Sequence, residues 1–145
     1  MNKMMHCRIL CFTIFVVLYA CAGIPLNDYY PRSPDEEEII EVIIKHERAW
    51  NEQDILGFMT TYHNSVRIED GCNGPLVSKN EFSDRIEQLM NEYPTVKFFN
   101  PKLNISENSA FVTVTSTRLG NHVHLFRLEM LKENDHWLIV KETCN

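Results

Sequence analysis

The sequence has 145 residues, 44% of them hydrophobic, and a formal net charge of −6 at pH 7. This length and composition fit a single domain with a sizeable hydrophobic core. Because the chain is acidic overall and has no basic run, we do not expect it to bind nucleic acid or anionic lipid surfaces.

Residues 1–22 have the pattern of a targeting segment, with a basic start and an apolar stretch from Ile9 to Leu18 that is too short to span a membrane. Two cleavage sites remain open. The tetrapeptide Leu-Tyr-Ala-Cys, which ends at Cys21, resembles the lipobox of bacterial lipoproteins, and Cys21 would then be lipidated. Ala-Cys-Ala at 20–22 fits ordinary secretion. We therefore expect an exported protein of the bacterial periplasm or cell envelope, anchored by lipid, or alternatively a secreted one.

Of the five cysteines, Cys72 and Cys144 lie outside the targeting segment. In an oxidising compartment these two can form a disulfide, and the alternative is two buried free thiols. We expect no metal site, since no Cys-x-x-Cys or His-x-x-x-His pattern accompanies them. No cofactor motif is present either.

Three helices are expected before the sheet, preceded by a flexible tether at 23–33. Ser33 and Pro34 are typical of a helix start, and the apolar positions that follow have helical spacing as far as Trp50. His46 falls on the same apolar stripe, and we interpret it as a hydrogen-bonded histidine at the core margin. A shorter helix leads to Tyr62, and a third helix spans about 78–93.

Three consecutive strands are expected between 111 and 143, because runs rich in Val, Thr, Phe and Leu alternate with turn-forming residues. Two-residue hairpin loops at 120–121 and 134–135 would fix the register of these strands. The cross-strand pairs that follow from these loops are Thr117 with His124, Thr115 with Phe126, Met130 with Ile139, and Arg127 with Glu142.

Both faces of the predicted sheet are largely apolar, which is unusual for a sheet with one side in water. One face carries Thr115, His124, Phe126 and Trp137. One face is expected to pack on the helices. The other is expected to pack on a second copy of the chain, which predicts a homodimer through the sheet.

The order of elements, with Ala-Trp-Asn-Glu-Gln-Asp at 49–54 and Trp-Leu-Ile-Val at 137–140, resembles the NTF2-like superfamily. The similarity extends to its SnoaL-like and DUF4440-like members and covers about residues 35–143. The resemblance implies an α+β, cystatin-like cone over residues 34–145. In such a cone a curved, mostly antiparallel sheet packs on three N-terminal helices, an apolar pocket lies inside, and many members dimerise through the sheet.

Enzymes of this fold use a carboxylate or histidine base and a tyrosine or acid donor, and the residues here that could act in this way are His124, Tyr62 and Asp70. The residues expected to line the pocket are Trp50, Tyr62, Thr115, His124, Phe126 and Trp137. Because no catalytic motif fixes these positions, we favour a domain that binds a small apolar ligand or mediates assembly without catalysis. The alternative is a metal-independent isomerase, dehydratase or cyclase with a His or Asp base and a Tyr donor.

Overall fold

A computed structural model describes residues 23–118 and 122–145 of the chain. The targeting segment with Cys21, and the turn expected at 120–121, lie outside these residues. No helix in the described part is long and apolar enough to cross a bilayer. The elements in chain order are η1 (Leu26–Asp28), α2 (Pro34–Asn51), α3 (Ile55–Met59), β1 (Tyr62–Glu69), β2 (Leu76–Ser78), α4 (Lys79–Ser83), α5 (Ile86–Glu92), β3 (Val96–Ser106), β4 (Ser109–Arg118), β5 (His122–Glu133) and β6 (His136–Cys144).

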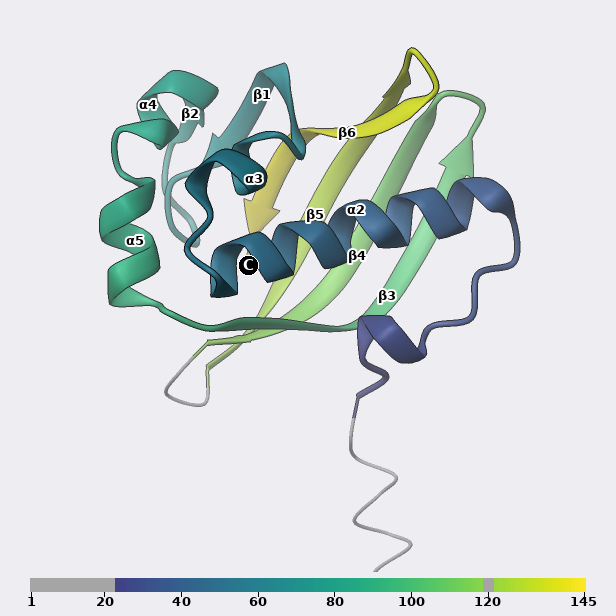
Figure 1. The fold of residues 1–145 in the computed structure, drawn as a ribbon, viewed down its shortest axis with the longest axis horizontal. Helices are drawn as coiled ribbons and strands as arrows, with labels where there is room; N and C mark the ends of the chain where they lie inside the picture. Colours follow the sequence, from purple (N-terminus) through teal and green to yellow (C-terminus); the bar gives the residue numbers. More distant parts are fainter. Residues whose placement is uncertain (1–22, 119–121) are drawn as a thin grey trace, which may run out of the picture.

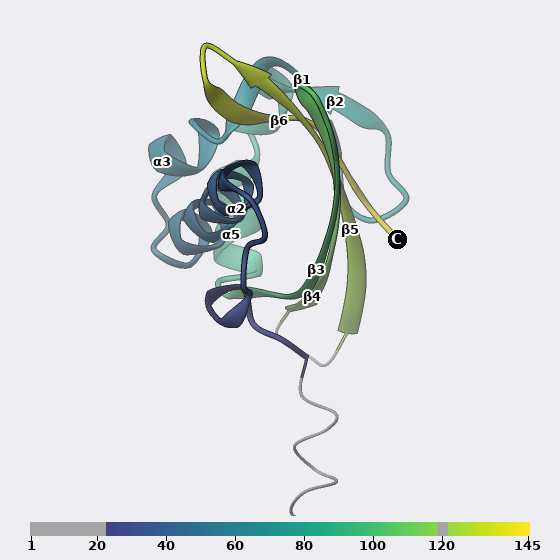
Figure 2. The same ribbon diagram turned by 90° about the vertical axis from the view of Figure 1, so that its right-hand side faces the viewer.

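The strands form one curved sheet in the order β2-β1-β6-β5-β4-β3. Neighbouring strands are antiparallel, except that β1 runs parallel to β6. The sheet bends around α2, and α2, α3 and α5 lie on its concave side (Figures 1 and 2). This is the α+β arrangement expected from the sequence, with the core between α2 and the concave face.

Helix α2 begins where the sequence predicts. The Ser33 side chain accepts a hydrogen bond from the backbone N–H of Glu36 at 3.2 Å, and Pro34 occupies the first turn. The residues of α2 that face the sheet are buried and follow one another at helical spacing: Ile39, Ile43, His46 and Trp50. An apolar stripe at helical spacing therefore fixes how α2 lies across the concave face.

The segment expected to be a loose tether is docked on the domain. Ile24 exchanges hydrogen bonds with Asn100 at 2.8 Å, through the Asn100 side chain and backbone, and Pro25 forms a β-bridge with Phe99. Leu26 is only 4% exposed. Residues from Ile24 onward are therefore part of the folded domain, because they add to the edge of β3 and bury an apolar side chain there.

The predicted register between β4 and β5 is wrong by one residue. The structure pairs Val114 with Phe126 and Ser116 with His124, whereas Thr115 lies opposite Leu125. The cause is the length of the connection. Arg118 pairs with His122, so three residues separate the paired ends instead of the predicted two. This difference of one residue moves every β4 side chain to the other face relative to the prediction. Thr115 therefore lies on the outer face of the sheet, away from the cone interior.

The hairpin between β5 and β6 has the predicted two-residue turn, in which Asn134 and Asp135 both have positive φ, at 49° and 60°. Met130 pairs with Ile139 as expected. A bulge then shifts the register, so that Glu142 lies opposite Leu128 rather than Arg127. This shift turns Glu142 from the outer face to the interior of the cone.

Candidate functional site

Four polar side chains meet inside the cone, between α2 and the concave face of the sheet. His46 Nδ1 lies 2.8 Å from Thr61 Oγ1, and the Thr61 hydroxyl donates to the Phe58 carbonyl at 2.7 Å. Tyr62 donates its hydroxyl proton to Glu142 Oε2 at 2.6 Å. His46 Nε2 lies 3.5 Å from the same carboxylate oxygen. Glu142 is thus contacted by one side chain from α2 and one from β1.

Burial sets the protonation of this network. Because Thr61 donates its own proton to Phe58, His46 donates from Nδ1, a tautomer inferred from the hydrogen bonds. Burial lowers the pKa of His46 to about 3, so the ring is neutral at pH 7. Burial, followed by the negative charge of Glu142, raises the pKa of Tyr62 well above its usual value and keeps the phenol protonated.

The contact between His46 and Glu142 would be an ion pair only if the imidazole were charged. Its 3.5 Å length exceeds the roughly 2.7–2.9 Å of a charge-assisted N–H···O hydrogen bond. Removing the imidazole from water opposes a charge on it, and this effect dominates for a ring that is 3% exposed. We therefore describe His46 as a neutral ring packed beside a carboxylate.

Aromatic side chains fill most of the space around this network. The His46 ring stacks at 4.0 Å between centroids on Phe58, and Phe98 contacts Phe126 at 5.7 Å. Two interior cavities of about 20 and 40 Å³ remain, and Trp50, Phe126 and Glu142 border both of them. A water molecule needs about 10–15 Å³ by such a measure, whereas ligand pockets usually span about 300–1,000 Å³. These cavities have room for a few water molecules and are too small for a ligand of that size.

A disulfide between Cys72 and Cys144 closes one end of the cone. It ties the turn that follows β1 to the end of β6, with 4.7 Å between the two Cα atoms. The Cys144 backbone N–H donates to the Glu69 carboxylate at 2.7 Å, and His124 Nδ1 lies 3.3 Å from Cys72 Sγ. Two distant segments and the start of β5 therefore meet at this end.

The structure brings together only some of the residues predicted for a site. Trp50 and Phe126 border the interior cavities, and Tyr62 joins the polar network. His124 shares the inner face but contacts Cys72, so Tyr62 is paired with Glu142 instead. Asp70 forms an ion pair with Arg85 and borders neither cavity.

Two predicted pocket residues lie elsewhere. Thr115 is on the outer face because of the register shift described above. Trp137 is buried, but its indole N–H donates to the Asp35 carboxylate at 3.2 Å, and its ring borders a groove outside the cone. Trp137 therefore anchors the start of α2 to β6 and does not reach the interior cavities.

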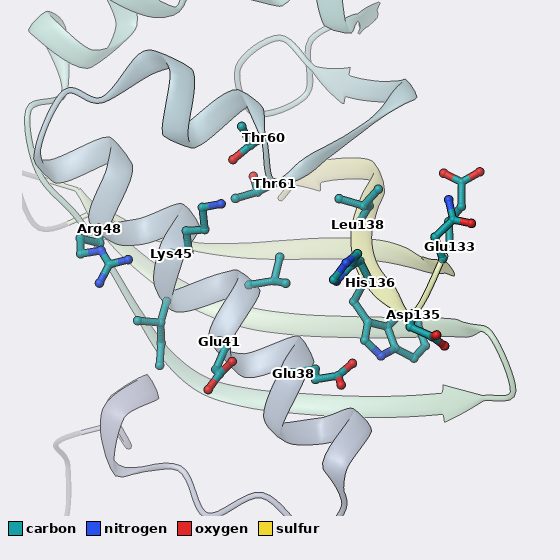
Figure 3. Close-up of a pocket in the computed structure, with 14 residues that line it drawn as sticks. Glu38, Glu41, Lys45, Arg48, Thr60, Thr61, Glu133, Asp135, His136 and Leu138 are labelled. Carbon is teal, nitrogen blue, oxygen red and sulfur yellow. The ribbon is translucent and has the colours of Figure 1, made fainter.

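This external groove has a volume of about 860 Å³. It lies between α2, the start of β1 and the β5–β6 hairpin (Figure 3). Glu38 and Glu41 line one stretch of α2 in the groove, and Lys45 and Arg48 line the next. It is an open, mixed-charge surface, and its lining includes Thr61 of the polar network.

The sequence predicted His46 as a hydrogen-bonded histidine on the apolar stripe, and its burial and its contact with Thr61 confirm this. Sequence reasoning missed the role of Glu142. Glu142 had no such signal, because strict alternation along β6 assigns it to the outer face, and only the bulge reverses that assignment.

No protein-family model matches this sequence, and no curated protein matches it. Solved structures do match the fold. A protein of unknown function with a cystatin-like fold from Nostoc punctiforme is 13% identical, with a TM-score of 0.66, over 80% of this chain and 93% of its own. A candidate ketosteroid isomerase from Shewanella frigidimarina is 17% identical, with a TM-score of 0.65, over 86% of this chain and 100% of its own.

A third structure, a candidate calcium/calmodulin-dependent protein kinase II association domain from Xanthomonas campestris, is 11% identical. Its TM-score is 0.67, over 80% of this chain and 90% of its own. The cone, the strand order and these similarities define an NTF2-like, cystatin-like α+β domain, which confirms the fold class predicted from the sequence. At these identities the similarity establishes the fold and leaves the function to be argued from the residues.

Proposed function

We propose that this chain is an exported NTF2-like domain that assembles with a second copy of itself through the outer face of its sheet, without catalytic activity. The observation that carries the proposal is the apolar character of that face. Phe111 is 44% exposed, Val123 65%, Leu125 38% and Leu131 37%, all on β4 or β5. Exposed apolar side chains gathered on one face of a sheet are typical of an interface.

Neighbouring outward positions support the same reading. Thr115 pairs with Leu125 and Thr117 with Val123, so uncharged side chains continue across β4 and β5. Two charged residues, Arg127 and Glu129, lie between Leu125 and Leu131 on the same face of β5. Lys141 donates to the Glu129 carboxylate at 2.9 Å, which balances the charge of Glu129. A two-fold contact places the same patch on both copies.

The filled interior argues against ligand turnover. The cavities of about 20 and 40 Å³ beside the polar network are too small for an organic substrate, and the polar groups of His46, Tyr62 and Glu142 hydrogen-bond or pack against one another. By the same argument, a small apolar ligand would have to displace the aromatic packing. Assembly needs no such rearrangement.

Export and lipid anchoring at Cys21 are part of the proposal. They are supported by the targeting pattern of residues 1–22 and by a disulfide, which is typical of oxidising compartments. Mass spectrometry of the mature N-terminus tests this part. A lipidated Cys21 is expected, and an unmodified start at Gly23 would replace the anchor with secretion.

Native mass spectrometry of the exported protein tests assembly. We expect a dimer for the wild type and a monomer for Leu125→Lys, which places a charge in the apolar face. Leu56→Lys is the matched control, because Leu56 is 81% exposed on α3, away from the sheet. A wild-type monomer at micromolar concentration, or a Leu125→Lys dimer, would overturn the proposal.

One observation favours a second candidate, a small pocket enzyme. Tyr62 and Glu142 supply a protonated donor and a carboxylate inside the cone, the pairing used for proton abstraction next to a carbonyl. Isomerisation of a β,γ-unsaturated ketone, followed by absorbance, tests this candidate. Turnover that is lost in Glu142→Gln would support it, and no turnover by the wild type would eliminate it for this substrate class.

A further inference from the structure

Three side chains that can ligate a metal converge at the closed end of the cone. Cys72 comes from the turn after β1, His124 from the start of β5, and Cys144 from the end of β6. Their ligand atoms all lie within 4.8 Å of one another. Because Cys72 is 52 residues from His124 and 72 from Cys144, no short sequence motif joins these residues.

We propose that Cys72, Cys144 and His124 bind a zinc ion when the disulfide is reduced. A dithiol reductant would take up the disulfide by exchange, becoming a disulfide itself and leaving two thiols on the protein. Zinc would then bind both sulfurs as thiolates, with release of two protons, and would also bind His124 Nδ1. Thiolate and imidazole are ligands that zinc prefers.

The geometry is close to that of a zinc site already. Zn–S bonds of about 2.3 Å and Zn–N bonds of about 2.0 Å place sulfur and nitrogen about 3.5 Å apart on a tetrahedron. Cys72 Sγ and His124 Nδ1 are 3.3 Å apart with the disulfide intact. Once the S–S bond is broken, the two sulfurs need to separate to about 3.8 Å, the corresponding S–S edge.

The segments that carry the three ligands differ in how easily they can move. His124 and Cys144 are held in paired strands, opposite Ser116 and Phe126 respectively. Cys72 lies in the turn between β1 and β2, and it can move by rotation of its side chain and a small shift of the turn. Opening the sulfur pair therefore requires no change in the sheet.

The surroundings suit a divalent cation and leave a position for water. The interior cavity of about 40 Å³ is bordered by Cys144 and by the Glu69 and Glu142 carboxylates. It has room for a water molecule beside Cys144, and negative side chains nearby favour a positive ion. Zinc would hold the turn after β1 against β5 and β6, as the disulfide does. This role goes beyond assembly through the outer face.

The test uses the full chain, reduced with a phosphine and titrated with Co²⁺ and then Zn²⁺. We expect thiolate-to-cobalt absorption that zinc displaces, and one more zinc per chain than in Cys72→Ser/Cys144→Ser, which keeps the three N-terminal cysteines. The oxidised wild type is a second control that lacks the two thiols and keeps its fold.

His124→Gln separates the imidazole from the thiols, and its fold can be checked in the oxidised state before reduction. Loss of this ligand should weaken zinc binding by at least about tenfold, since even groups beyond the direct ligands affect affinity to that extent. Two results would overturn the proposal. One is zinc uptake by the reduced wild type no greater than by the oxidised protein. The other is equal affinity in His124→Gln and wild type.

Discussion

Lowering the pH should destabilise this domain through His46. The folded ring has a pKa of about 3, against an ordinary value of 6.5, because it is buried. Between these values the unfolded chain binds one more proton than the folded chain, so the free energy of unfolding falls as the pH falls. The stabilising contribution is complete above pH 6.5 and is lost progressively toward pH 3. From pH 7 to pH 5 the loss is about 2 kcal/mol, at about 1.4 kcal/mol per pH unit.

The assay is urea unfolding followed by tryptophan fluorescence, for wild type and His46→Gln, at pH 7, 6 and 5 and one protein concentration. Glutamine can still hydrogen-bond to Thr61 but does not titrate, so the variant should lose about 2 kcal/mol less over this range. The pKa values of Asp35 and Glu36 are lowered, so their protonation changes the free energy of unfolding only below this pH range. Any effect of Glu47 is the same in both proteins and cancels in the comparison. Parallel profiles would mean that folded His46 is already charged beside Glu142.

Three further changes test other contacts. Tyr62→Phe removes the donor to the buried carboxylate of Glu142 and should cost about 1.5–3 kcal/mol in urea unfolding, whereas an unchanged midpoint would place that hydrogen bond outside the stable core. Cys72→Ser/Cys144→Ser opens a loop closed over 72 residues and should lower stability by about 4 kcal/mol, measured against the wild type under oxidising conditions. Leu26→Ala should cost about 2–5 kcal/mol because this side chain is 4% exposed, and no loss would restore the loose-tether interpretation.

Local signals in the sequence were sufficient for much of the fold. The Ser33 cap marks the start of α2 as predicted. A capping box at Ser78 marks the start of the helix predicted at about 78–93, which the structure divides into α4 and α5. The Asn134–Asp135 turn has the positive φ values that such a pair permits. In each case the deciding interaction lies within a few residues of chain, so the sequence alone contains it.

The features that could not be predicted depend on which face of the sheet a side chain occupies, and on contacts between residues far apart in the sequence. A single extra loop residue moved Thr115 to the outer face, and a bulge moved Glu142 to the interior. Neither event changes the composition of the strands, so alternation alone cannot reveal it. The pairing of Ile24 with Asn100 likewise depends on which strand forms the edge of the sheet.

The docked N-terminal segment has a consequence for how this protein avoids aggregation. β3 lies at one edge of the sheet, where an open row of N–H and C=O groups would invite another strand. Ile24 and Pro25 occupy part of that row, and Asn100, with a φ of 51°, precedes a proline that donates no hydrogen bond. Strand addition at this part of the β3 edge is therefore hindered.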